Sequence, residues 1–241
     1  MRLRHLIPLA LIISIGGCTD IGAINDTSDD RHDFALTGSL LVIDNHVGDL
    51  RLVAGTGAAV AVRRSLTGKA TVKGNATWSM AGDTLRLAVT CSGFVPDCGG
   101  LYVVSVPPGV AVRVTSDAPV RAVELGAALT ATVSDGWLKV ERPASRLRLT
   151  AEFAVDVTDA RSADVTASSG ENAVRLGFAI PPTRVEARAA GSVQVTLPAG
   201  PETYRVTTSP GRSALPSDPT SKRSVAAHAG EGYAASVRKA S

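Results

Sequence analysis

From residue 38 onward, apolar and polar residues alternate in many short segments of the chain. The alternation is clearest in residues 110–114, 146–149, 155–157 and 193–197. Every second side chain of a strand points to the same face, so each segment has one apolar and one polar face. No stretch of helical length carries the three- and four-residue apolar spacing of an amphipathic helix. The pattern predicts an all-β protein.

A glycine leads several of these segments. The leading glycines are Gly48, Gly82, Gly136, Gly170 and Gly191. Gly170 and Gly191 are about twenty residues apart, which is typical of one coil of a solenoid. Each coil of such a fold covers its apolar edge only by stacking on the next coil. We therefore predict a β-solenoid-like body of short stacked strands. The alternative is an antiparallel β-sandwich. The irregular spacing between Gly82 and Gly136 favours this alternative.

The N-terminus has the features of a bacterial export signal. Arg2 and Arg4 precede a short apolar run, residues 6–15, which is too short to span a bilayer. The run ends in Ile15-Gly-Gly-Cys18, which resembles the lipobox of bacterial lipoproteins. We predict a signal peptide over residues 1–17, lipidation of Cys18, and a lipid-anchored location outside the cytoplasm. The alternative is an ordinary signal peptide in which Cys18 lies by chance.

The composition divides the remaining chain into a linker and one domain. Residues 19–35 are polar and acidic with little apolar periodicity, so we expect residues 18–36 to hold the lipidated cysteine and a flexible tether. Residues 37–238 are expected to form a single domain. Within it, residues 209–220 are rich in Pro, Ser and Gly and predict a loop. The alternating residues 224–237 either cap the open end of the stack or form a frayed tail.

Cys91 and Cys98 are the two cysteines that remain once Cys18 is lipidated. Outside the cytoplasm, two such cysteines usually pair. The two cysteines do not have the Cys-x-x-Cys spacing of a metal or redox site, and the sequence has no second cysteine pair to complete a zinc site. We predict a Cys91–Cys98 disulfide.

The charge balance and the aromatic content exclude several classes of partner. The chain has 25 Lys and Arg against 22 Asp and Glu, a formal net charge of +3, and only 4% aromatic residues. A dedicated nucleic-acid-binding protein has a larger basic excess. The low aromatic content also disfavours aromatic-lined sugar clefts. We expect no nucleic-acid partner, no cofactor and no metal.

The motifs in the body resemble those of a known bacterial family. The chain has an opening Val42-Ile-Asp-Asn-His-Val-Gly-Asp-Leu-Arg-Leu52, a strand that ends in Pro-Pro-Gly109, glycine-led coils at Gly136 and Gly170, and a closing Gly230-Glu-Gly-Tyr233. In these features it resembles the bacterial "putative adhesin" family, domain of unknown function 4097. The resemblance spans residues 38–237, and residues up to about 100 depart from clean repetition. It implies a right-handed parallel β-solenoid-like body, usually exported or membrane-attached, and it brings no catalytic residues.

Candidate catalytic groups are few. His46 lies near Asp44 and Asp49, but Asp44-Asn-His46 falls where a turn is expected between two strands, so we interpret it as a solvated turn. The acidic residues of the tether, with His32, are interpreted as a solvated linker rather than a cation site. Glycoside chemistry needs two converging carboxylates. The acidic residues of the body are scattered along the sequence; they include Glu141, Glu152, Asp156, Glu171 and Glu186.

Arginines at outward positions of successive strands form the best candidate surface. They are Arg142, Arg146, Arg148, Arg161, Arg175, Arg184 and Arg188. Stacked coils would align such residues about 4.8 Å apart, and guanidinium groups suit phosphate and carboxylate partners. Acidic residues are interspersed among them, so we interpret the arginines first as a means of solubility and keep an anionic-partner surface as the alternative.

These observations predict a membrane-anchored extracytoplasmic lipoprotein. Its β-rich body would act in adhesion, binding or scaffolding at the cell envelope, without catalysis. Its partners would be the membrane, through the N-terminal lipid, and an envelope polymer or an envelope protein. The alternatives are a glycan-active enzyme built on a β-helix and an accessory protein of envelope-stress signalling.

Overall fold

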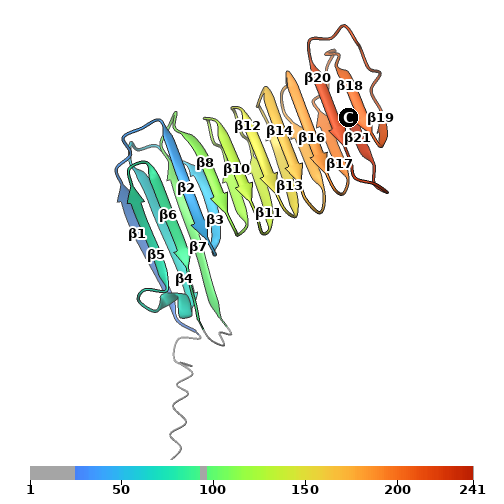
Figure 1. The fold of residues 1–241 in the computed structure, drawn as a ribbon. Helices are drawn as coiled ribbons and strands as arrows, with labels where there is room; N and C mark the ends of the chain where they lie inside the picture. The colour runs from blue at the N-terminus through green and yellow to red at the C-terminus, as the bar shows by residue number, and fades with distance from the viewer. Residues whose placement is uncertain (1–24, 93–96, 241) are drawn as a thin grey trace, which may run out of the picture.

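The computed structural model describes residues 25–92 and 97–240, and these residues form two large β-sheets that face each other across one apolar core. Figure 1 shows the strands lying side by side along a long body. We call the eleven-stranded sheet sheet A and the ten-stranded sheet sheet B. The cysteine predicted to carry the lipid, Cys18, and the predicted signal peptide lie outside the described residues.

The strands of sheet A are, in spatial order, β1 (Thr27–Phe34), β4 (Val60–Gly68), β7 (Cys98–Val106), β3 (Asp49–Ala54), β9 (Val120–Val123), β11 (Trp137–Glu141), β13 (Ala154–Ala160), β15 (Val174–Phe178), β17 (Val193–Leu197), β21 (Ala235–Lys239) and β19 (Gly211–Ser213).

The strands of sheet B, again in spatial order, are β18 (Arg205–Ser209), β20 (Ser224–His228), β16 (Arg184–Ala189), β14 (Asp164–Ser169), β12 (Leu147–Ala151), β10 (Leu129–Val133), β8 (Ala111–Ser116), β2 (Leu40–His46), β6 (Thr84–Val89) and β5 (Ala76–Ala81).

The two sheets confirm the solenoid-like fold. Along most of the chain, a strand of sheet B leads through a short turn into a strand of sheet A, and equivalent strands of successive coils pair in parallel. Apolar residues keep register in this stack: Leu138 pairs with Val120 on one side and Val155 on the other, and all three are fully buried. The antiparallel pairing of the alternative fold occurs only among β1, β4 and β7 and between β5 and β6 in the described chain.

The coils at both ends are not stacked in chain order. The β2–β3 coil lies between β6–β7 and β8–β9. Likewise β20–β21 lies between β16–β17 and β18–β19. Residues 224–237 therefore do not cap the stack as expected, because β18–β19 is the last coil.

Two predicted boundaries differ from the structure. Part of the predicted tether, Thr27–Phe34, is strand β1, paired over its whole length with β4. The predicted loop at residues 209–220 contains the short strand β19. The rest of that loop covers the outer edge of β18, because Ser217 Oγ accepts the Val206 N–H at 2.9 Å and the Asp218 N–H donates to the Tyr204 carbonyl at 2.9 Å.

A single arginine joins the two sheets at the N-terminal end of the stack. Arg64 in β4 donates to Asp30 of β1 at 2.9 Å and to the Ala76 carbonyl of β5 at 3.0 Å. Its guanidinium carbon also lies 4.2 Å from the ring centroid of Trp78 in β5. These contacts close the end of the core where no further coil of the described chain stacks on it.

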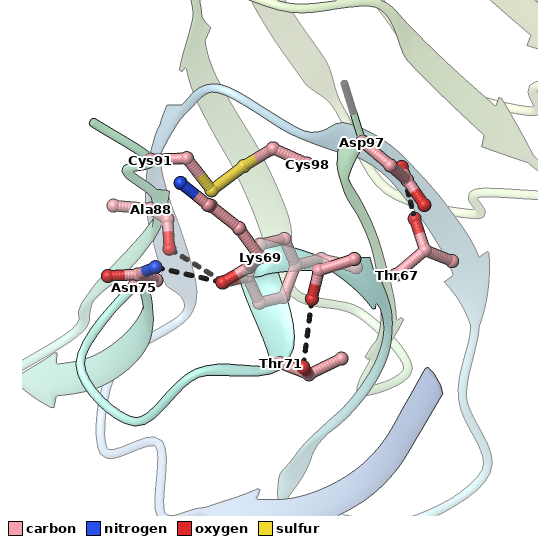
Figure 2. The surroundings of a disulfide bond; sticks show 10 residues. Thr67, Lys69, Thr71, Asn75, Ala88, Cys91, Asp97 and Cys98 are labelled. Atoms are coloured by element: carbon pink, nitrogen blue, oxygen red, sulfur yellow. Dashed lines mark hydrogen bonds between the residues drawn. A yellow bond between two sulfur atoms is a disulfide. The ribbon is translucent and has the colours of Figure 1, made fainter. Parts of the chain in front are cut away.

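The predicted disulfide is confirmed. Cys91 and Cys98 are bonded, with their Cα atoms 6.4 Å apart. Figure 2 shows the bond beside the 3-10 turn η2 (Lys69–Thr71), where the Asn75 side chain donates to the Lys69 carbonyl at 2.8 Å. At the same corner the Gly68 N–H donates to the Asp26 carbonyl at 2.9 Å, which holds the residue before β1 against the end of β4.

Turns that lead from sheet B into sheet A also stack on one another. Backbone N–H groups donate from Phe153 to Gly136 at 3.0 Å, from Asn172 to Phe153 at 2.9 Å, from Gly191 to Asn172 at 2.8 Å, and from Gly230 to Gly191 at 3.1 Å. We call these five residues the turn ladder. A Cβ atom on Gly191 would lie 2.8 Å from the carbonyl carbon of Asn172, so the close approach of the coils explains this glycine.

Candidate functional site

A line of basic side chains crosses the outer face of sheet A. The register brings one central residue of each strand into a single line, which we call the basic row. It consists of Arg31, Arg63, Val103, Arg51, Arg121, Lys139, Asp156, Arg175, Gln194, Ser236 and Arg212. Seven of these residues are Arg or Lys, and one is acidic. Successive strands place them about 4.8 Å apart.

Like charges are direct neighbours in the middle of the basic row. Arg51 pairs in register with Arg121, and Arg121 with Lys139. All three side chains are exposed, while the residues before and after each of them are buried. Like charges directly opposite each other on neighbouring strands destabilise a sheet. The contacts between these like charges therefore do not stabilise the sheet.

Few carboxylates neutralise the basic row. Arg121 forms an ion pair with Glu141 at 2.6 Å, and Arg31 with Asp33 at 3.1 Å. The Nζ atom of Lys139 lies 5.2 Å from the ring centroid of Trp137. Among residues 25–92 and 97–240, no carboxylate lies within 4.0 Å of the remaining cations of the row, which are Arg51, Arg63, Lys139, Arg175 and Arg212.

In the part of sheet B formed by β12, β14 and β16, cations are paired with carboxylates. Arg148 binds Asp164 through two hydrogen bonds, of 3.1 and 3.0 Å, and Arg146 lies 3.2 Å from the same carboxylate. The hydrogen bond from Arg148 lowers the pKa of Asp164, and the same bond raises the pKa of Arg148. Glu186 likewise pairs with Arg184, at 3.4 Å, and with Arg188. The cations of these strands are thus largely neutralised within the sheet.

The structure does not bring the seven predicted arginines onto one surface. Only Arg175 belongs to the basic row. Four of the others lie on or beside the strands of sheet B and pair with carboxylates there. Arg142 and Arg161 lie in turns, and Arg142 pairs with Glu124 at 2.8 Å, which raises the pKa of Arg142. The expected single ladder of these arginines is wrong, because strands that follow each other in sequence belong to different sheets.

Sequence reasoning missed most of the basic row. Its missed cations are Arg31, Arg51, Arg63, Arg121, Lys139 and Arg212. A signal for three of them exists, because Leu50-Arg-Leu52, Val120-Arg-Ala122 and Leu138-Lys-Val140 each place a cation between two buried residues. The same signal occurs at Leu147-Arg-Leu149 in sheet B, so it does not by itself select sheet A.

The residues around His46 are strand residues rather than a turn. Asp44, Asn45 and His46 end β2, and the turn is formed by Val47 and Gly48, both with positive φ. His46 Nδ1 lies 3.2 Å from Asp117 and its Nε2 lies 3.4 Å from Asp44, and the ring is exposed.

The buried neighbour of His46, Asn45, holds two coils together. Its side-chain amide donates to the Gly48 carbonyl and to Ser116 Oγ, both at 2.9 Å. This residue of the opening motif therefore supports the stacking of the coils.

Two of the carboxylates considered for glycoside chemistry, Glu141 and Glu186, form ion pairs with nearby arginines. Within the part of the chain that the structure describes, no group of three or more His, Cys, Asp or Glu residues is placed to hold a metal ion. No helix among the described residues is long and apolar enough to cross a membrane.

A pocket of about 390 Å³ adjoins the basic row near its C-terminal end. We call it the Tyr233 pocket. It is lined by Ala154, Asn172, Ala173, Arg175, Gly191, Ser192 and Tyr233. It therefore combines one cation of the basic row with an exposed aromatic ring, a feature that the low aromatic content of the chain did not predict.

No family model matches the chain, and no curated protein matches it. The solved structures to which the chain is similar include the following three. A putative adhesin from Bacteroides fragilis is 12% identical with a TM-score of 0.42, covering 88% of this chain and 97% of that chain. A putative adhesin from Parabacteroides merdae is 8% identical with a TM-score of 0.35, covering 89% and 96%. A putative cell adhesion protein from Clostridium sporogenes is 11% identical with a TM-score of 0.33, covering 89% and 99%. Similarity of this degree identifies neither a family nor a function.

Proposed function

We propose that the protein is a lipid-anchored binding protein of the bacterial cell envelope whose rigid, non-catalytic β body holds an acidic envelope polymer on the outer face of sheet A. The observation that carries the proposal is the basic row, which continues in register across all the strands of the sheet. Binding of this kind would serve adhesion or scaffolding.

The basic row suits an extended partner. A guanidinium group presents a planar fork of donors that matches carboxylate and phosphate groups. The row repeats such groups at the strand spacing along the axis of the stack, so a linear polyanion can contact several coils at once. Each contact is weak at an exposed site, and simultaneous contacts give useful affinity.

The N-terminal corner limits how far the body could lie from a membrane to which Cys18 is anchored. Asp26 is held to Gly68 by a backbone hydrogen bond, and β1 begins one residue later. The chain from Cys18 to Asp26 is eight residues long and can span at most about 30 Å. A lipid on Cys18 would therefore keep the first strands of the stack within about 30 Å of the membrane surface. A flexible tether that extended to residue 36 would allow a larger distance.

The polymer contact is tested with the full-length protein in detergent, using immobilised polygalacturonate as the acidic probe and dextran as the neutral one. The test variant carries Arg51→Glu, Arg121→Glu and Lys139→Glu. We expect it to bind polygalacturonate about a hundredfold more weakly than the wild type at low salt, because attraction at three sites becomes repulsion.

The matched control reverses three exposed cations of sheet B, Arg86→Glu, Arg113→Glu and Arg205→Glu, which changes the net charge equally. We expect this control to keep most of the affinity. Equal losses in the two variants would show that only net charge matters, and the assignment to sheet A would be wrong. Equal binding of dextran and polygalacturonate by the wild type would also overturn the proposal.

The anchor is tested separately in cells. We expect labelled palmitate to be incorporated into the wild-type protein and not into the Cys18→Ser variant, which would be released from the membrane fraction. A Cys18→Ser variant that remains labelled would contradict the proposed lipidation site.

A further inference from the structure

We propose that the Tyr233 pocket binds one acidic sugar residue, with the sugar carboxylate on Arg175 and the sugar ring against Tyr233. This inference rests on the proposed function and names the class of polymer as a polyuronate, that is, a chain of sugars that each carry a carboxylate.

The floor of the pocket is made of small residues from successive coils. Ala154, Ala173 and Ser192 come from three neighbouring coils of sheet A or from the turns just before its strands, and Gly191 belongs to the turn ladder. A side chain on Gly191 would collide with the backbone of the coil below it. Because these lining residues are Ala, Gly and Ser, none of them carries a long side chain that would cover the floor of the pocket.

One wall of the pocket is held in place by backbone hydrogen bonds. Tyr233 follows a turn in which its N–H donates to the Gly230 carbonyl at 3.2 Å, and Gly230 in turn donates to Gly191 at 3.1 Å. The Tyr233 side chain is 57% exposed, the largest exposed fraction among the large hydrophobic residues described. These bonds fix the Tyr233 backbone, and the exposed ring is available to a ligand at a small entropy cost because Tyr has only two side-chain torsions.

The polar side chains that line the pocket are exposed and have no side-chain hydrogen bond to the described residues. No side-chain hydrogen bond joins the Asn172 amide, the Ser192 hydroxyl or the Arg175 guanidinium to another residue among the described parts of the chain. Arg175 is exposed and has Asp156 and Gln194 as its neighbours in the basic row. Donors and acceptors thus line one pocket, and its cation has no carboxylate within 4.0 Å among the described residues.

These features select an acidic sugar over other anions. The apolar face of a pyranose packs against an aromatic ring, its hydroxyl groups suit an amide and a hydroxyl, and its carboxylate suits the guanidinium fork. A volume of about 390 Å³ is large enough for one sugar ring. An inorganic phosphate chain can use Arg175 but has no ring to place on Tyr233.

The experiment measures binding of trigalacturonate and of polyphosphate to the full-length protein by calorimetry. We expect Tyr233→Ala to weaken trigalacturonate binding about tenfold, in the range of a small hot-spot residue, and to leave polyphosphate binding unchanged. Tyr233→Phe keeps the ring and should retain most of the affinity. Phe153→Ala serves as the matched control, because Phe153 is an exposed aromatic of the turn ladder that does not line the pocket.

The outcomes separate the two proposals. If polygalacturonate binds through the basic row but Tyr233→Ala weakens trigalacturonate no more than Phe153→Ala does, the pocket inference is wrong and the proposed function stands. Equal losses for trigalacturonate and polyphosphate would also contradict a sugar site. If the wild type binds none of these polyanions, both proposals fail.

Discussion

Replacing Gly191 by alanine tests the stacking of the coils on which the proposed binding face depends. Gly191 is buried, and an added Cβ would lie 2.8 Å from the carbonyl carbon of Asn172 and 3.2 Å from its Cα, with the carbonyl oxygen closer still. These are backbone atoms of the preceding coil and cannot rotate away. The two coils must therefore move apart at the turn ladder.

The size of the effect follows from three contributions. Separation weakens the hydrogen bonds from Gly191 to Asn172, at 2.8 Å, and from Gly230 to Gly191, at 3.1 Å, and each contributes about 1 kcal/mol. Crowding in a packed site costs about 1–3 kcal/mol. Alanine offsets about 0.4–1 kcal/mol by reducing the entropy of the unfolded chain. We expect a net loss of about 3 kcal/mol, which lowers Tm by about 6–12 °C in a protein of this size.

Thermal and urea unfolding followed by far-UV circular dichroism measure this loss. Gly126→Ala is the matched control: Gly126 is exposed, no atom lies within 4 Å of the position that an added Cβ would occupy, and its φ is not positive. We expect the control to unfold at the wild-type temperature or slightly above it. Equal Tm values for the two variants would refute the argument that close approach of the coils requires glycine at residue 191.

Three further predictions concern local stabilisation. Replacing Cys91 and Cys98 by serine should lower the free energy of unfolding by about 2–3 kcal/mol, measured by urea titration, because the disulfide restricts a short loop of the unfolded chain. The hydrogen bond from Arg148 lowers the pKa of Asp164 below its ordinary value of 3.8, so the stabilisation is present above that pH and is lost as the pH falls below it. The Asp164→Asn variant should therefore have a lower Tm than the wild type at pH 7. Thermal melts at decreasing pH should show this difference in Tm shrinking below about pH 4. A difference in Tm that stays constant with pH would contradict the prediction. Arg64→Ala should lower the free energy of unfolding by about 1–3 kcal/mol and change the tryptophan fluorescence, because it removes the contacts that close the N-terminal end of the stack. An unchanged midpoint of urea unfolding would show that other contacts close this end.

Local periodicity predicted the strands well where one face of the strand is buried. Alternation at residues 193–197, for example, marks β17, in which every second residue is buried. The strand at Thr27–Phe34 was missed because it has almost no apolar residues and its exposure is nearly uniform. Backbone pairing with β4 makes it a strand, and charged side chains are typical of an edge strand of this kind.

The candidate site depends on information that periodicity does not contain. The basic row runs through β7, β3 and β9, although β3 precedes β7 in the chain by several strands. This order arises because the β2–β3 coil inserts between two later coils. The sequence shows that Arg51 and Arg121 each lie between apolar residues, but only the pairing of β3 with β9 makes them neighbours.

The two outer faces of the protein differ in how they space their charges. On sheet B, Thr130 lies in register between Arg113 and Arg148, so these cations are two strand spacings apart, about 10 Å. That separation exceeds the Debye length of about 8 Å at physiological salt, and solvent ions screen the repulsion. On sheet A, Arg51 and Arg121 lie on neighbouring strands, about 4.8 Å apart, which is well inside the Debye length. The arrangement on sheet B is sufficient for solubility. On sheet A, the ion pair of Arg121 with Glu141 offsets part of the repulsion, whereas Arg51 and Lys139 have no carboxylate within 4.0 Å among the described residues. An anion that lies across the row would offset the remaining repulsion, which supports the proposed assignment of sheet A as the binding face.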